Sequence, residues 1–342
     1  MMKNCAVTII SIFSFATSYA KSAGDSAAIY FSKAKALQEQ RRWNDAENHY
    51  QKALGFQPNN FEIHQAFGDY YMQLRKYKEA KTVFEKMHQL RPSDTAALSQ
   101  LATLSFNLKK FPEAALYLSE LSQYSPSEFT DIRLGKAYTE TEDYGKAIAA
   151  FSAAVKKNPR SAEANYELAR SFSETSNYRK AIPHYLQAIA TEPTRFVWVY
   201  ELGLLYFSLS ETANAIASFE KAVALGLPKD LAFLENLGMA QLSTKDYQAG
   251  IATLQELLIK KPNDPQVMYQ IAQAWFKHEK FEKAREMWEK VVANDETNYR
   301  ALYMIGMTWQ KMGKITKGRE ISDRAIAGDP TLSKMKHEKF TF

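Results

Sequence analysis

The sequence predicts an all-α protein, a solenoid built from repeated pairs of short helices. Two observations carry this prediction: a proline recurs at a nearly constant spacing, and small and aromatic residues recur in phase with it. The prolines are Pro58, Pro92, Pro126, Pro159, Pro193, Pro228, Pro262 and Pro330. Their successive differences are 34, 34, 33, 34, 35 and 34 residues, then 68, which is two periods. Such a period indicates stacked helical repeats, each burying its apolar face against its neighbours.

Residues 1–20, MMKNCAVTIISIFSFATSYA, predict a secretory signal peptide. Lys3 provides the positive start, residues 6–16 form the apolar segment, and Ser18 and Ala20 are the small residues that a signal peptidase reads. The apolar segment is short for a membrane span, although an uncleaved anchor is the alternative. No other stretch resembles a membrane helix. We therefore expect a periplasmic or secreted bacterial protein with no integral membrane segment after signal cleavage.

The remaining composition narrows the possible chemistry. Cys5 is the only cysteine and lies inside the predicted signal, so the mature chain would have no disulfide and no thiolate nucleophile. The formal net charge is +6, from 44 basic and 38 acidic residues. Lys and Arg alternate with Glu and Asp along nearly every predicted helix, which indicates a solvated face. We therefore expect no nucleic-acid binding. Residues 21–26 form a short polar lead.

The stretch 61–94 shows the repeated unit most clearly. Its apolar residues fall on one face of each of two short helices, and Pro92 ends the second helix while Asp94 offers an N-cap for the next. A small residue recurs inside each first helix: Ala34, Gly68, Ala102, Gly135, Ala169, Gly203, Gly238, Ala272 and Gly306. A small residue also recurs near the start of each second helix: Ala46, Ala80, Ala114, Ala147, Ala181, Ala215, Gly250, Ala284 and Gly318. A large residue follows four positions later, except at Ser322. Small residues allow paired helices to approach closely, and large ones fill the space beside them.

On these positions the chain resembles the tetratricopeptide repeat family, with about nine repeats covering residues 27–330. The expected copies are 27–60, 61–94, 95–127, 128–161, 162–195, 196–230, 231–264, 265–298 and 299–330. The resemblance implies a right-handed superhelix of antiparallel helix pairs. Residues 331–342 would form a capping tail, with Leu332 and Met335 packed against the last repeat. Because signal, lead, repeats and tail account for all 342 residues, no segment remains for a catalytic domain. We expect no enzyme activity.

A few positions depart from the repeat. Pro183 lies inside a second helix, where proline disturbs helical hydrogen bonding. Gly250 and Gly318 replace the alanine of other copies, and each is expected to cost about 1 kcal/mol relative to alanine in a helix interior. The joint at residues 226–228 is one residue longer than in other copies, and Thr212 replaces the aromatic residue expected before it. The stretch 208–230 and the ninth repeat are therefore expected to be the least stable parts.

The sequence offers no cofactor or metal site. No two of the six histidines stand three or four residues apart, none forms a metal-ligand motif, and no glycine-rich phosphate loop occurs. The family resemblance implies that the second, fifth, ninth and twelfth residues of each first helix line a concave groove. Aromatic, methionine and basic residues gather at or beside these positions from the fifth repeat onward. The predicted partner-binding residues are Tyr166, Arg170, Tyr200, Phe207, Tyr269, Phe276, Lys277, Arg300, Tyr303 and Met307. The alternative is that these side chains pack between repeats.

The leading hypothesis is an exported, non-enzymatic scaffold that holds a protein or peptide of unknown identity in its groove. The Lys and Asn residues with which some family members clamp a partner's C-terminal carboxylate are missing here. The alternative is a glycan- or cell-wall-binding protein, because tyrosine rings stack on sugars. No motif in the sequence separates these two readings.

Overall fold

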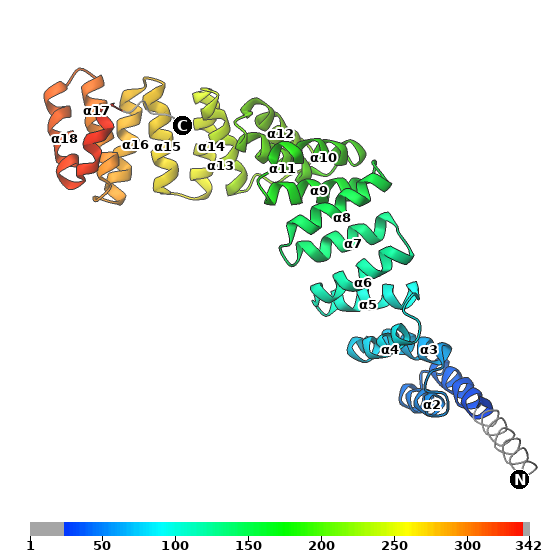
Figure 1. The fold of residues 1–342 in the computed structure, drawn as a ribbon. Coiled ribbons are helices and arrows are strands. Elements are labelled where there is room, and N and C mark those ends of the chain that lie inside the picture. Colours follow the sequence, from blue (N-terminus) through cyan, green and yellow to red (C-terminus); the bar gives the residue numbers. More distant parts are fainter. Residues whose placement is uncertain (1–23, 338–342) are drawn as a thin grey trace, which may run out of the picture. The chain divides into compact units, whose positions relative to one another are not determined.

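The structure, a computed structural model, describes residues 24–337. The predicted signal peptide and the last five residues of the predicted tail lie outside the described residues. Within 24–337 nearly the whole chain is helical and no strand occurs (Figure 1). The chain divides into two compact units, residues 1–175 and 176–342.

The first unit begins with a helix over residues 24–39, which already includes the last three residues of the predicted polar lead. Eight further helices follow: α2 (Trp43–Phe56), α3 (Phe61–Gln73), α4 (Tyr77–Leu90), α5 (Thr95–Asn107), α6 (Phe111–Tyr124), α7 (Glu128–Thr139), α8 (Tyr144–Lys157) and α9 (Ala162–Glu174). From α2 to α9 each helix packs against the next in the chain (Figure 1). The unit is therefore a one-dimensional stack of helices.

The second unit repeats this arrangement. Its helices are α10 (Tyr178–Thr191), α11 (Phe196–Ser208), α12 (Thr212–Ala224), α13 (Leu231–Ser243), α14 (Tyr247–Lys260), α15 (Pro265–Lys277), α16 (Phe281–Asn294), α17 (Tyr299–Lys311) and α18 (Ile315–Gly328). A 3₁₀ helix, η1 (Pro330–His337), follows α18 and packs against it. Helix α10 runs without interruption through Pro183. The predicted all-α solenoid of paired helices is confirmed.

The helix boundaries have local causes. Most first helices, meaning those that open a repeat, start at an N-cap side chain that accepts a hydrogen bond from a backbone N–H in the first turn. Asp94 does this for α5, with its Oδ1 2.7 Å from Ala97 N, as the sequence predicted. The other such caps are Asn60, Ser127, Ser161, Asp230, Asp264 and Asn298. These caps fix where each first helix begins, and therefore which residues fall on each of its faces.

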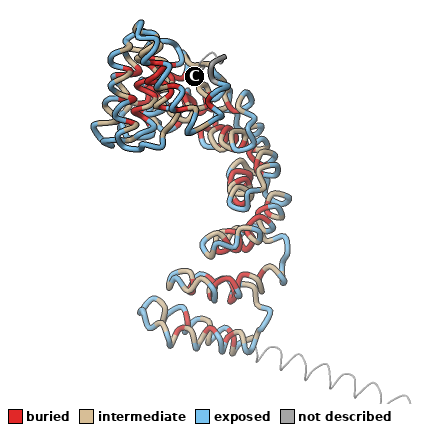
Figure 2. The backbone as a smooth tube through the Cα atoms, turned by 90° about the vertical axis from the view of Figure 1, so that its left-hand side faces the viewer, coloured by how far each residue is buried: buried red, intermediate tan, exposed pale blue. Residues whose placement is uncertain are grey.

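The two helices of a pair meet where a small residue faces a large one. A Cβ atom added to Gly68 would lie 2.8 Å from the Phe84 ring, and one added to Gly135 would lie 2.5 Å from the Phe151 ring. The expected role of these positions is thus confirmed. Buried residues follow these contacts between neighbouring helices, while the other helix faces are exposed (Figure 2). Packing at this distance leaves no room for a larger side chain.

The expectation for Gly318 was wrong, and that for Gly250 stays a prediction. A Cβ at Gly318 would lie 2.5 Å from the Gly306 carbonyl oxygen and 2.8 Å from the Gln310 backbone nitrogen. A Cβ at Gly250 would lie 2.5 Å from Leu242 Cδ2. Helix propensity favours alanine at such positions, but at Gly318 the backbones approach so closely that only glycine fits, whereas the nearest atoms to Gly250 belong to the side chain of Leu242. In the ninth repeat Ser322 replaces the usual large residue, which is consistent with this closer approach.

The end of the solenoid is covered in part as expected. Leu332 of η1 is 4% exposed and belongs to the core cluster of the last two repeats. The side chain of Met335 lies outside the described residues. No helix in the described part of the chain is both long and apolar enough to cross a membrane.

We predict that Gly306→Ala destabilises the protein by about 1–3 kcal/mol, because the new methyl group would overpack the contact between α17 and α18. The control is Gly55→Ala in α2, where the added Cβ meets nothing within 4 Å. That change should be neutral or stabilise by up to about 1 kcal/mol. Chemical denaturation followed by circular dichroism measures both. Equal effects of the two variants would contradict the packing argument.

Because two tyrosines of the first unit are buried, we predict that the stability of the fold decreases at alkaline pH. Tyr50 donates a hydrogen bond to Gln38 Oε1 at 2.6 Å, and Tyr70 donates one to the Trp43 carbonyl oxygen at 2.8 Å. Burial raises the pKa of each hydroxyl from 10.0 to about 12. The pKa of each hydroxyl is therefore higher in the folded state than in the unfolded state. The contribution of these tyrosines to the free energy of unfolding is complete below pH 10, and it is lost as the pH rises towards 12 because deprotonation favours the unfolded state.

Denaturation midpoints measured across that pH range should therefore fall. In the double variant Tyr50→Phe, Tyr70→Phe the fall should be shallower. An unchanged slope in the double variant would show that other groups cause it.

Candidate functional site

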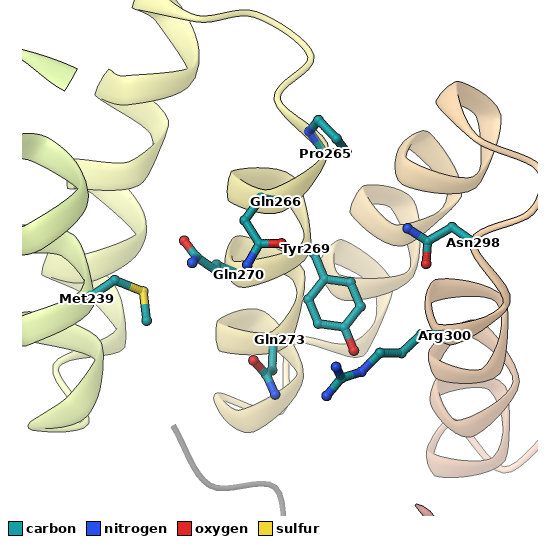
Figure 3. Close-up of a pocket in the computed structure, with 8 residues that line it drawn as sticks. All are labelled: Met239, Pro265, Gln266, Tyr269, Gln270, Gln273, Asn298 and Arg300. Carbon is teal, nitrogen blue, oxygen red and sulfur yellow. The ribbon is translucent and has the colours of Figure 1, made fainter. Parts of the chain in front are cut away.

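A pocket of about 410 Å³ lies across three successive first helices of the second unit, α13, α15 and α17. Its lining residues are Met239, Pro265, Gln266, Tyr269, Gln270, Gln273, Asn298 and Arg300. Figure 3 shows Met239 at one side, the residues of α15 in the middle, and Asn298 and Arg300 at the other side. We call this the amide pocket, because four of its side chains are carboxamides.

Tyr269 and Arg300, both predicted from the sequence, meet in this pocket. The guanidinium carbon of Arg300 lies 5.6 Å from the centre of the Tyr269 ring, a cation–π distance. The Tyr269 hydroxyl is buried and donates no hydrogen bond among the described residues, although the Arg300 guanidinium lies close to its oxygen. Burial raises its pKa, and the positive charge of Arg300 partly opposes this. The hydroxyl is therefore protonated near neutral pH and can donate a hydrogen bond to a ligand.

A second polar group in the amide pocket also lacks a partner. Gln270 is 9% exposed, and its buried Oε1 accepts no hydrogen bond among the described residues. Gln266, Gln270 and Gln273 are spaced by four and three residues along α15, which places their side chains on one face of the helix. Leaving a polar group buried without a partner costs about 1–3 kcal/mol, so a ligand that supplies the partners would recover that free energy.

A hollow in the first unit differs from the amide pocket in its hydrogen bonding. It measures about 680 Å³ and is lined by residues that include Gln38, Tyr50 and Gln73. Gln38 accepts a hydrogen bond from Tyr50 and donates one to Gln73 at 2.9 Å. These polar side chains already satisfy one another. Two buried groups of the amide pocket do not, which makes it the better candidate for binding.

The lining of the amide pocket offers binding rather than acid–base chemistry. None of its residues is a carboxylate, a histidine or a lysine. A carboxamide carries both a donor and an acceptor, which matches the N–H and C=O of a peptide group. Within residues 24–337 no cluster of histidine, cysteine, aspartate and glutamate side chains is placed to hold a metal ion.

Other predicted residues of the second unit pack rather than face the amide pocket. Tyr303 is 0% exposed and lies in the core cluster with Leu332. It is therefore not a surface residue, and the packing alternative holds there. Tyr200 accepts a hydrogen bond from Asn236 at 2.9 Å and lies 5.5 Å from the Phe219 ring centre.

Phe276 lies 5.4 Å from the Phe281 ring centre and 5.6 Å from that of Trp288. Phe207 and Met307 are partly buried against core clusters. Burial lowers the pKa of the half-buried Lys277. These residues lie at the border between core and surface, and none of them lines the amide pocket.

Two predicted residues lie in the first unit. Arg170 forms an ion pair with Glu167 at 3.6 Å, and its guanidinium carbon is 5.7 Å from the Tyr166 ring centre. Burial raises the pKa of Glu167, while Lys136 and Arg170 oppose this.

Sequence reasoning missed the carboxamides because it searched for aromatic and charged groups. Gln266 and Gln273 occupy the second and ninth positions of α15, which the family resemblance had already assigned to the groove. Gln270, at the sixth position, was not among the groove positions. The sequence feature that could have predicted the carboxamides is the presence of three glutamines on one face of α15.

Comparisons with known proteins agree with the fold. Family models described as tetratricopeptide repeat match residues 61–94, 132–196, 200–265 and 266–296. A comparison with curated proteins found no match.

Among solved structures, the C-terminal part of a TPR repeat-containing protein from Cytophaga hutchinsonii is 20% identical, with a TM-score of 0.54 over 71% of this chain and 98% of that one. A chain of the Naa15/Naa10 complex bound to HypK-THB is 15% identical, with a TM-score of 0.54 over 89% of this chain and 58% of that one. YrrB, described as a TPR protein with an unusual peptide-binding site, is 21% identical, with a TM-score of 0.46 over 55% of this chain and 99% of that one.

Proposed function

The chain belongs to the tetratricopeptide repeat family, whose repeats imply a protein–protein interaction scaffold, and from this premise we propose that it binds an extended peptide segment of a partner in the amide pocket. One observation carries the proposal: Tyr269 and Gln270 both line the pocket, and among the described residues the buried Tyr269 hydroxyl has no acceptor and the buried Gln270 Oε1 has no donor. An extended peptide presents alternating N–H and C=O groups that can satisfy both.

The charges around the amide pocket support a peptide ligand. Arg300 is the only charged residue of the lining, so the pocket accepts neutral main-chain groups and tolerates a nearby carboxylate. Gln266 and Gln273 extend the row of carboxamides along α15 on either side of Gln270. Such a row binds main chain with little dependence on side-chain sequence, which suits a scaffold.

The glycan alternative depended on open tyrosine faces, and the contacts favour it less. Tyr303 is buried, Tyr200 lies against Phe219 and Phe233, and Arg300 lies over the Tyr269 ring. A sugar ring needs an aromatic face free of such neighbours.

The proposal includes export. Its support is the sequence pattern of residues 1–20, with a basic start, an apolar segment and small residues before the expected cleavage point. The protein would then meet its partner in the periplasm or outside the cell.

Tyr269→Phe tests the pocket. Removing an unpartnered buried hydroxyl should stabilise the unbound protein by about 1 kcal/mol, and losing its hydrogen bond to the ligand should weaken peptide binding by about 3- to 10-fold. The probes are peptides selected from a random-sequence library against the wild-type protein. Thermal melts and fluorescence anisotropy give the two readouts.

The matched control is Tyr303→Phe. Its hydroxyl is also buried without a partner among the described residues, but it lies in the core and not in the pocket. This variant should gain the same stability with no change in peptide affinity. The proposal is wrong if the two variants bind the selected peptides equally well, or if no selected peptide depends on Tyr269.

Export is tested on the full-length chain expressed in a bacterium and recovered from its envelope fraction. Mass spectrometry should find a mature protein that begins at Lys21, because Ala20 is the expected last residue of the signal. An intact N-terminus with the apolar segment retained would support the anchor alternative. Recovery only from the cytoplasm would overturn the export proposal.

A further inference from the structure

A second group of side chains, in the first unit and separate from the amide pocket, has the properties of a carboxylate-binding site. It consists of Thr103 and Phe106 on α5 and of Phe129 and Arg133 on α7, and we call it the Arg133 site. The guanidinium carbon of Arg133 lies 5.9 Å from the Phe106 ring centre and 5.6 Å from the Phe129 ring centre. The charged group is therefore held beside two aromatic rings.

The Arg133 guanidinium has no counter-ion. Its Nη2 donates a hydrogen bond to Thr103 Oγ1 at 2.8 Å, and no carboxylate lies within ion-pair distance among the described residues. Burial lowers its pKa, although an arginine stays charged at neutral pH. A desolvated charge without an opposite charge is costly in free energy. Such an arrangement persists most readily where a ligand supplies the missing charge.

The carboxylates of α7 are engaged elsewhere. Asp131 accepts a hydrogen bond from Lys157 at 2.6 Å, and Glu128 accepts one from Asn158 at 2.9 Å. Lys136, on the same helix, donates to Glu163 at 2.6 Å. The Arg133 site therefore carries one uncompensated positive charge, which matches a monoanionic carboxylate better than a dianionic phosphate.

The aromatic residues of the site differ in what they do. Phe106 is half-buried and is supported by the Phe111 ring, with centres 5.7 Å apart. Phe129 is 66% exposed, among the most exposed large apolar side chains of the described residues. Nothing in the described part of the chain explains an exposed phenylalanine beside a desolvated arginine. Exposed aromatic and arginine side chains together are the composition of binding hot spots.

We infer that the Arg133 site binds an acidic segment of a partner protein, with one Asp or Glu carboxylate on the Arg133 guanidinium and apolar atoms of the segment against Phe129. The planar guanidinium can hold a carboxylate through two parallel hydrogen bonds. Phe106 and Thr103 keep it in place. This inference does not rest on the peptide binding proposed for the amide pocket.

The test uses the full-length protein and two end-blocked, fluorescein-labelled hexapeptides, one with alternating Glu and Ala and one with alternating Gln and Ala. Wild-type protein should bind the Glu peptide at least about tenfold more tightly than the Gln peptide, and added salt should reduce this difference. Arg133→Met keeps the length of the side chain and should abolish the preference. Phe129→Ala should weaken binding of both peptides by about fivefold or more.

Matched controls come from the same unit. Arg75→Met removes an exposed cation, and Leu116→Ala removes an apolar side chain that is 71% exposed on a second helix. Neither should change the affinity for the Glu peptide. If the Arg133→Met variant unfolds, Phe129→Ala decides alone, because its exposed ring contributes little to folding. Equal binding of both peptides by the wild-type protein, or wild-type binding by Arg133→Met or Phe129→Ala, would overturn the inference.

Discussion

The close approach of the two helices within each pair is the constraint on which the solenoid depends. Gly68 meets the Phe84 ring and Gly135 meets the Phe151 ring. The large side chain of each of these second helices therefore packs against the first helix of the same pair. In the ninth repeat the helices of the pair pack without a large side chain between them. Small residues there, Gly306, Gly318 and Ser322, bring the two backbones together. In both arrangements one face of the first helix is fully used in packing. Residues on its other face are then free to differ from repeat to repeat without loss of the fold.

Most of the fold follows from the sequence because its causes are local and repeated. The prolines, the N-cap residues such as Asp94, and the small residues act within one helix pair, so a 34-residue period is enough to locate them. The consequence of Gly318 could not be predicted in this way. Helix propensity is a property of one residue, whereas the short distance from Gly318 to the Gly306 carbonyl oxygen depends on the backbone of another helix.

The candidate site was predicted less well, for a physical reason. Tyrosine is at home both in a core and on a binding surface, so its position in the repeat does not decide between Tyr269, in the amide pocket, and Tyr303, in the core. Phe207 and Met307 are ambiguous in the same way. The carboxamide of Gln270 was overlooked because its significance lies in a missing hydrogen bond, and a sequence does not show which hydrogen bonds are made.

Buried groups that lack a hydrogen-bond partner or a counter-ion mark the two proposed sites, but a missing partner alone is not a sufficient criterion. The Tyr303 hydroxyl also lacks a partner among the described residues, but Tyr303 is 0% exposed and does not line the amide pocket. What distinguishes Tyr269 and Gln270 is that the space beside them can admit a ligand. Arg133 meets the same condition differently, since the exposed ring of Phe129 marks an open side next to its guanidinium. In each case the unbound protein is less stable than it would be if the buried group had a partner. A ligand that supplies this partner would recover the lost free energy on binding.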